Sequence, residues 1–175
     1  MAGSPLLARC YIGLGSNLEN PIRQIETALT ELNSLPLTRC EKVSSLYHSQ
    51  PMGPADQPNF VNAVAELLTE LPAPDLLTEM LNIELRHGRL RANDGLIKNG
   101  PRTLDLDLLL HGNQVVNEPG LTLPHPGLHQ RDFVIIPLLE IAPDLTIPEL
   151  GRLLNFRTSA VEHGAKRGQP PNWQA

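Results

Sequence analysis

The chain has 175 residues and a formal net charge of −5, and 41% of its residues are hydrophobic but only 3% are aromatic. This length suits one domain rather than two, and the hydrophobic content suffices for a buried core, which excludes a chain that is disordered throughout. The negative charge and the scarcity of aromatic rings argue against a nucleic-acid-binding surface, so we expect no nucleic-acid partner.

The first half of the chain predicts three strands and one helix from its hydrophobic periodicity. A short apolar run leads into a glycine-containing turn, where Ser16 or Asn17 is expected to cap a helix that begins at Pro21. The predicted elements are a strand at 9–14, a helix at 21–32, a strand at 42–49, a proline-rich loop at 50–58 and a strand at 60–68.

The second half predicts a helix, a strand and a less regular end. Its predicted elements are a helix at 74–87, a basic loop at 88–100, an alternating strand at 103–110, turns at 111–113 and 123–126, a helix at 133–139 despite Pro137, and a short helix at 150–156. The order β-α-β-β-α-β predicts an α+β fold with a ferredoxin-like βαββαβ core, an antiparallel-rich sheet with helices packed on one face, and a C-terminal extension. We expect one domain at 1–163 and a disordered tail at 164–175.

The cysteines and the hydropathy bear on the location of the protein. Cys10 and Cys40 are too few for a disulfide framework or a cysteine-rich zinc site, so two buried thiols are expected. No targeting segment and no apolar run of membrane-spanning length is visible. We therefore expect a soluble cytoplasmic protein without a membrane partner.

The most informative stretch is GPRTLDLDLLL at 100–110, in which two aspartates alternate with leucines. Residues two apart in a strand point to the same face, so Asp105 and Asp107 are expected to project together while the leucines face the core. Two carboxylates side by side repel each other and need a cation. Mg²⁺ prefers carboxylate and phosphate oxygens, so this pair is a candidate magnesium site; a solvated strand face is the alternative.

A basic loop leads directly into this strand. Between residues 86 and 102 there are five basic residues and one acidic residue, a local charge of +4 in an acidic chain. Most of these cations are arginines, which suit bidentate contacts to phosphate oxygens. The loop and the aspartate pair together predict a polyphosphate site with one or two metal ions, and a solvated basic loop is the alternative. The five basic residues are Arg86, Arg89, Arg91, Lys98 and Arg102.

The glycine-containing stretch at 13–17 does not complete a nucleotide-binding fingerprint. Gly13 and Gly15 fit the first two positions of G-x-G-x-x-G, but Leu18 occupies the third. A P-loop motif is also absent from the sequence. We therefore interpret this stretch as a turn, and we do not expect a dinucleotide-binding or P-loop fold.

Several of these motifs, in the same order, resemble the 6-hydroxymethyl-7,8-dihydropterin pyrophosphokinases, a family of folate-pathway enzymes. The resemblance extends from about residue 9 to about residue 156. Several ordered motifs in one chain are far more specific than any one alone. The motifs are YIGLGSNL at 11–18, QPNFVN at 57–62, GPRTLDLDLLL at 100–110, LPH at 123–125 and RDF at 131–133.

The resemblance implies a reaction in which ATP donates its terminal pyrophosphoryl group to the hydroxymethyl oxygen of the pterin and AMP leaves. It implies ATP as co-substrate and two Mg²⁺ ions held by Asp105 and Asp107. It also implies that Arg89, Arg91 and Arg102 act with these aspartates in catalysis. The implied ATP-binding residues are Glu84, Arg89, Arg91, Lys98, Arg102, Thr122, His125 and Arg131. The implied pterin-binding residues are Ser49, Gln50, Met52, Phe60, Asn62 and Phe133.

Two other functions stay open at this point. A different two-metal enzyme, such as a nucleotidyl- or glycosyltransferase with an Asp-x-Asp pair, would bind a nucleotide but not a pterin. A non-catalytic ferredoxin-like module would bind RNA or protein, although the charge and the few aromatic rings oppose RNA. For the pyrophosphokinase we expect a monomer whose partners are the two small-molecule substrates.

Overall fold

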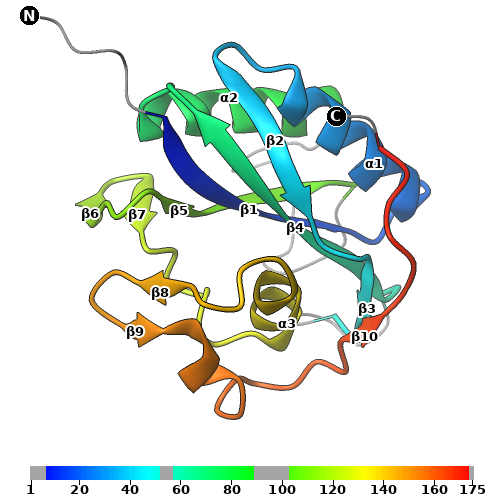
Figure 1. The fold of residues 1–175 in the computed structure, drawn as a ribbon. Helices are drawn as coiled ribbons and strands as arrows, with labels where there is room; N and C mark the ends of the chain where they lie inside the picture. Colours follow the sequence, from blue (N-terminus) through cyan, green and yellow to red (C-terminus); the bar gives the residue numbers. More distant parts are fainter. Residues whose placement is uncertain (1–6, 52–56, 89–102, 174–175) are drawn as a thin grey trace, which may run out of the picture.

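A six-stranded antiparallel sheet forms the centre of the molecule (Figure 1). The structure is a computed structural model, and it describes residues 7–51, 57–88 and 103–173. The strands of this sheet are β1 (Ala8–Ser16), β2 (Thr38–Val43), β3 (Tyr47–Ser49), β4 (Phe60–Thr69), β5 (Asp105–His111) and β10 (Lys166–Arg167).

The strand order places β1 and β4 at the centre of the sheet. The order is β10-β3-β4-β1-β5, and β2 pairs with the same side of β4 further along its length. With β2 and β3 taken as one broken strand, this is the split βαβ arrangement of a ferredoxin-like fold. The predicted α+β class is therefore confirmed. The predicted single strand at 42–49 divides at Ser44, whose Oγ accepts a hydrogen bond from the Val64 amide.

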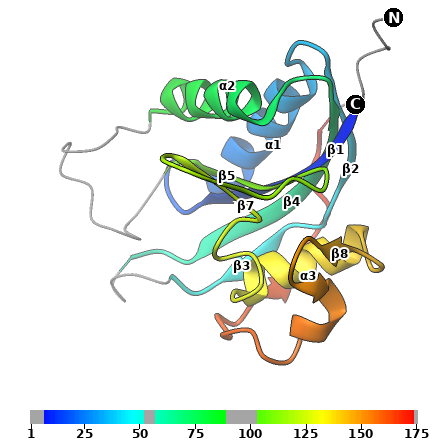
Figure 2. The same cartoon turned by 90° about the vertical axis from the view of Figure 1, so that its left-hand side faces the viewer.

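Helices cover both faces of the sheet, which differs from the one-sided arrangement predicted from the sequence. Figure 2 shows α1 (Pro21–Asn33) and α2 (Ala73–Arg86) on one face and α3 (Asp132–Ile141) on the other. The central strands carry buried apolar side chains on both faces: Ile12 packs in the cluster beneath α1 and α2, and Tyr11 packs in the cluster beneath α3. A sheet that is apolar on both faces requires cover on both.

The predicted cap of α1 is wrong. The N-cap residue is Asn20, with φ 62°, and its side chain makes no capping hydrogen bond. Ser16 Oγ instead donates to the carbonyl of Thr103, and Asn17 Nδ2 donates to Gln57 Oε1. These two side chains therefore tie the end of β1 to two segments distant in sequence.

The remaining elements are short. The hairpin of β6 (Val116–Glu118) and β7 (Leu121–Leu123) follows β5, and a second hairpin pairs β8 (Thr146–Ile147) with β9 (Gly151–Arg152). The predicted helix at 150–156 is only a 3-10 turn at Leu153–Phe156. In the part of the chain that the structure describes, no helix has the length and apolar character needed to cross a bilayer.

The C-terminal segment pairs with the sheet and packs on the core within the residues that the structure describes. Strand β10 pairs with His48 and Tyr47 of β3, and Trp173 packs against the apolar cluster beneath α1 and α2. The composition of this segment is polar, which favoured disorder. Edge pairing uses backbone groups, however, and composition does not report on it.

Candidate active site

The aspartate pair lies at the start of β5, beside two glycines of the neighbouring strand. Asp105 pairs with Gly15 and Asp107 with Gly13 in the antiparallel register of β5 and β1. Both aspartates are half-buried and point to the same face, as their spacing predicted. Because the facing residues are glycines, β1 places no side chain beside the carboxylates on that face.

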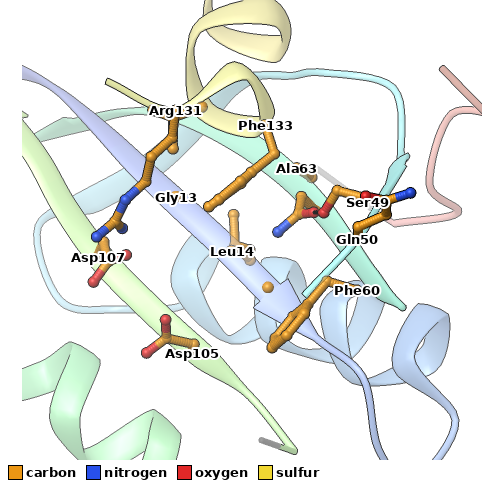
Figure 3. A pocket seen from close by; sticks show the side chains of 13 residues that line it. Gly13, Leu14, Ser49, Gln50, Phe60, Ala63, Asp105, Asp107, Arg131 and Phe133 are labelled. Carbon is orange, nitrogen blue, oxygen red and sulfur yellow. Dashed lines mark hydrogen bonds between the residues drawn. The ribbon is translucent and has the colours of Figure 1, made fainter. Parts of the chain in front are cut away.

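A cavity opens in front of this pair (Figure 3). Strands β1, β3, β4 and β5 and the start of α3 all contribute to its walls. The lining residues are Gly13, Leu14, Gly15, Ser49, Gln50, Phe60, Asn62, Ala63, Asp105, Asp107, Arg131, Phe133 and Val134.

Two aromatic rings contribute to opposite sides of this cavity. Phe60 comes from the first residue of β4, and Phe133 comes from the first turn of α3 (Figure 3). Arg131 precedes Phe133, and its guanidinium carbon lies 5.9 Å from the centre of that ring. Flat aromatic surfaces facing a cavity suit a flat heterocyclic ligand.

The amide of Asn62 is held in one orientation. Its Oδ1 accepts a hydrogen bond of 2.5 Å from Ser49 Oγ, and Ser49 is itself buried. The Nδ2 group therefore points toward Gly15, where it would lie 3.1 Å from an added Cβ. An amide that is fixed in orientation can recognise a ligand edge by hydrogen-bond polarity.

A second cavity lies on the other side of the aspartate pair and shares it. The shared residues are Asp105 and Asp107, which line both cavities. The other residues that line the second cavity are Leu77, Leu81, Glu84, Leu106, Leu108, Gly120, Leu121, Thr122 and His125. The carboxylate pair therefore stands where two separately bound molecules would meet.

Glu84 anchors the strand that carries the pair. It is 2% exposed and belongs to α2, and its Oε2 accepts a hydrogen bond of 2.8 Å from the backbone amide of Leu106. Leu106 lies between the two aspartates. A buried carboxylate needs such donors, so this contact fixes β5 against α2 at the position where the aspartates project.

His125 faces the aspartate pair from the turn after β7. Its Nδ1 accepts a hydrogen bond of 3.0 Å from the Gly127 amide, so in the neutral ring the proton resides on Nε2. That Nε2 lies 3.6 Å from Asp107 Oδ1. The backbone amide of His125 donates to the carbonyl of Leu109, which docks the turn on β5.

Every predicted site residue that the structure describes lines at least one of the two cavities. Ser49, Gln50, Phe60, Asn62 and Phe133 line the first, and Glu84, Thr122 and His125 line the second. Arg131, grouped with the ATP-binding residues by resemblance, lines the first cavity instead. The predicted residues Met52, Arg89, Arg91, Lys98 and Arg102 lie outside the described residues.

Sequence reasoning missed the role of Gly13 and Gly15 in the site. It assigned them to a turn, whereas β1 continues through both to Ser16. Their spacing of two contains the missing signal, because residues i and i+2 share one face of a strand. A strand face without side chains leaves space for a ligand.

The donor set fits Mg²⁺. The pair supplies hard carboxylate oxygens, and the described residues contain no cluster of three or more side chains able to ligate a metal by themselves. Magnesium is commonly held by one or two carboxylates together with waters and substrate phosphates. Two carboxylates beside an open cavity match that pattern.

A carboxylate pair between two cavities suits an enzyme of the phosphoryl-transfer type, in which bound metal ions and positioned substrates do most of the work. The family model for 7,8-dihydro-6-hydroxymethylpterin-pyrophosphokinase (HPPK) matches residues 11–143. The chain therefore belongs to this family.

Similar proteins agree with this assignment. The 2-amino-4-hydroxy-6-hydroxymethyldihydropteridine pyrophosphokinase of Pseudomonas aeruginosa is 49% identical over 93% of this chain and 98% of its own length. The enzyme of the same name from Haemophilus influenzae is 49% identical over 79% of this chain and 84% of its own. The solved structure of Plasmodium falciparum HPPK-DHPS A437G with SDX-DHP has a TM-score of 0.73 at 14% identity, which shows the fold alone. The match covers 94% of this chain and 49% of the Plasmodium falciparum chain.

Proposed function

We propose that this protein transfers the pyrophosphoryl group of ATP to the hydroxymethyl oxygen of 6-hydroxymethyl-7,8-dihydropterin, a step of tetrahydrofolate biosynthesis. The products are AMP, the pterin diphosphate and one proton. Membership of the HPPK family supports this reaction. The single structural observation that supports it best is the position of Asp105 and Asp107, which line two cavities of different character.

The pterin occupies the cavity with the two phenylalanines. Its flat ring stacks between Phe60 and Phe133, and the oriented amide of Asn62 recognises its polar edge. Ser49 holds that amide in place. Both aspartates border the same cavity, so the hydroxymethyl group of a bound pterin is directed toward them.

ATP occupies the second cavity and extends its triphosphate toward the same aspartates. Thr122 and His125 line this cavity and offer a hydroxyl and an imidazole to nucleotide oxygens. Arg131, which lines the first cavity, supplies a fixed positive charge. Arg89, Arg91, Lys98 and Arg102 belong to the same proposal and neutralise the phosphates.

Asp105 and Asp107 hold two Mg²⁺ ions in this proposal. When bound, the ions would offset the negative charge of the triphosphate during transfer. The protein's own contribution is to position the two substrates, because Glu84 and the β1 pairing fix the strand that carries the carboxylates. We further propose that the protein acts as a cytoplasmic monomer without a nucleic-acid partner.

The test is an assay of AMP formation with ATP, Mg²⁺ and 6-hydroxymethyl-7,8-dihydropterin. We expect AMP only when all three are present, and pterin omission is the control. A folded protein that binds Mg²⁺-ATP and forms no AMP with the pterin would contradict this proposal. It would favour another two-metal nucleotide-dependent transferase that uses the same aspartate pair.

A further inference from the structure

Residues 161–167, here called the bridging segment, contact two walls of the first cavity. One wall is the start of α3, with Arg131 and Phe133; the other is the end of β3 with Gln50. The bridging segment follows the residues 11–143 that the family model matches. It contributes no lining residue to either cavity. Any effect of this segment on the site therefore passes through the residues that it holds.

Its contact with α3 centres on the buried carboxylate of Asp132. Asp132 Oδ2 accepts hydrogen bonds from the backbone amides of His163 (2.9 Å) and Ala165 (3.1 Å), and its Oδ1 lies 3.3 Å from His163 Nδ1. The Asp132 amide donates to the carbonyl of Val161, so side chain and backbone both hold the segment. Asp132 stands directly between Arg131 and Phe133 in the chain.

The imidazole of His163 supports the ring of Phe133. The two ring centres lie 5.2 Å apart with an angle of 85° between the planes, which is an edge-to-face contact. The His163 side chain is only 13% exposed. The ring that borders the cavity is therefore supported from behind by the side chain of a residue whose backbone amide Asp132 holds in place.

The bridging segment also holds the opposite wall of the first cavity, at the end of β3. The backbone amide of Gln50 donates a hydrogen bond of 2.7 Å to the backbone carbonyl of His163. Lys166 and Arg167 form β10, which pairs with β3. Arg167 also donates to Glu140 of α3, whose carboxylate accepts a hydrogen bond of 2.7 Å from the Tyr47 hydroxyl. The bridging segment thus links α3 to β3 across the side of the cavity.

From these contacts we infer that Asp132 and His163 are positioning residues for the pterin. They set the spacing between Phe133 on α3 and Ser49 and Gln50 on β3 through the bridging segment. This inference rests on the proposed function. It assigns a role in pterin binding to residues that touch neither substrate cavity. Their effect should fall mainly on the pterin, because the residues that line the second cavity make none of these contacts and Arg131 is the one proposed ATP-binding residue among the described residues that the bridging segment adjoins.

The test compares Asp132→Ala, Asp132→Asn and His163→Ala in steady-state assays, with the pterin and ATP varied separately. For Asp132→Ala we expect the KM for the pterin to rise about tenfold, the scale of one lost charge-assisted hydrogen bond. The KM for ATP should change less than about twofold. Asp132→Asn should recover most of the pterin affinity, because an amide oxygen accepts the same two backbone hydrogen bonds.

His163→Ala removes the ring contact but keeps both backbone amides, so a smaller rise of about threefold in the pterin KM is expected. It also provides the test if Asp132→Ala does not fold. Asp144→Ala is the matched control, because this aspartate follows α3 and its side chain is 94% exposed. The KM values of this variant should equal those of the wild type.

Three results would overturn the inference. The first is that Asp132→Ala and His163→Ala have the same KM for the pterin as an active wild type. The second is an equal loss of affinity for both substrates, which indicates a general structural role. The third, a wild type that forms no AMP with the pterin, would overturn the proposed function as well. The first two leave that function intact, so the two failures are distinguishable.

Discussion

At the scale of single residues, the proposed chemistry depends on Asp105 and Asp107, which lie two positions apart in one strand. They border both cavities, and the His125 ring lies 3.6 Å from one of them. Both aspartates come from one strand that a buried glutamate holds. A change of charge at this point should therefore affect the reaction far more than the fold.

Asp107→Asn tests this directly. The amide has nearly the same shape but is a poor magnesium ligand, so we expect AMP formation to fall by at least about a hundredfold with little loss of stability. The measurement is kcat over a range of Mg²⁺ concentrations, together with the thermal midpoint. Asp144→Asn, an identical change at an exposed site, should leave both unchanged. Near-normal turnover in Asp107→Asn would remove this residue from the proposed metal site.

At the scale of elements, β1 forms the floor of the site by lacking side chains there. A methyl group on Gly15 would lie 3.1 Å from Asn62 Nδ2 and 3.7 Å from a ring carbon of Phe60, which is tight against the oriented amide. At Gly13 the nearest atoms would be 3.7 Å away, an ordinary contact distance. Gly15 therefore has less free space for a side chain than Gly13. Neither glycine has a positive φ that would strain an alanine.

We therefore expect Gly15→Ala to weaken pterin binding more than Gly13→Ala. A rise of about tenfold in the pterin KM for Gly15→Ala corresponds to the displacement of one hydrogen-bonding group. Separate determinations of the KM for the pterin and for ATP provide the comparison. Equal effects at the two positions would show that the Asn62 amide does not recognise the pterin.

The elements also show how far the sequence leads. The spacing of two between Asp105 and Asp107 predicted their common face, because strand geometry is local. The face covered by α3 and the pairing of β10 were not predictable in this way. Each depends on partners distant in sequence: α3 on apolar residues of β1 and β4, and β10 on a free edge of β3. The same reason explains why Asn17, interpreted as a cap, instead holds Gln57.

At the scale of the whole molecule, the core keeps two thiols protonated. Burial raises the pKa of Cys10 and of Cys40 from 9.0 to about 12. The folded state therefore binds these protons more tightly than the unfolded state does. The stabilisation is complete below the unfolded pKa of 9.0 and is lost as the pH rises from there through about 12.

Urea unfolding at about pH 8 and about pH 10 checks this. We expect a loss of roughly 1 to 2 kcal/mol per thiol between the two conditions. The double variant Cys10→Ala, Cys40→Ala is less stable at both values, because two buried side chains become smaller, but its free energy of unfolding should depend less on pH. An equally steep dependence in the double variant would assign the alkaline loss to other groups.

The path of the chain end determines where another protein module could be attached. After β10 the chain runs to α1 (Figure 1). There the backbone amide of Asn172 donates to the carboxylate of Glu26, and Trp173 packs on the core. Trp173, the last residue that the structure describes, thus lies on the face opposite α3, after the chain has passed the side of the first cavity. A module or affinity tag fused there is tethered away from that cavity. A fusion joined before residue 163 would instead remove the support behind Phe133. Attachment at that point is therefore expected to weaken the binding of the pterin.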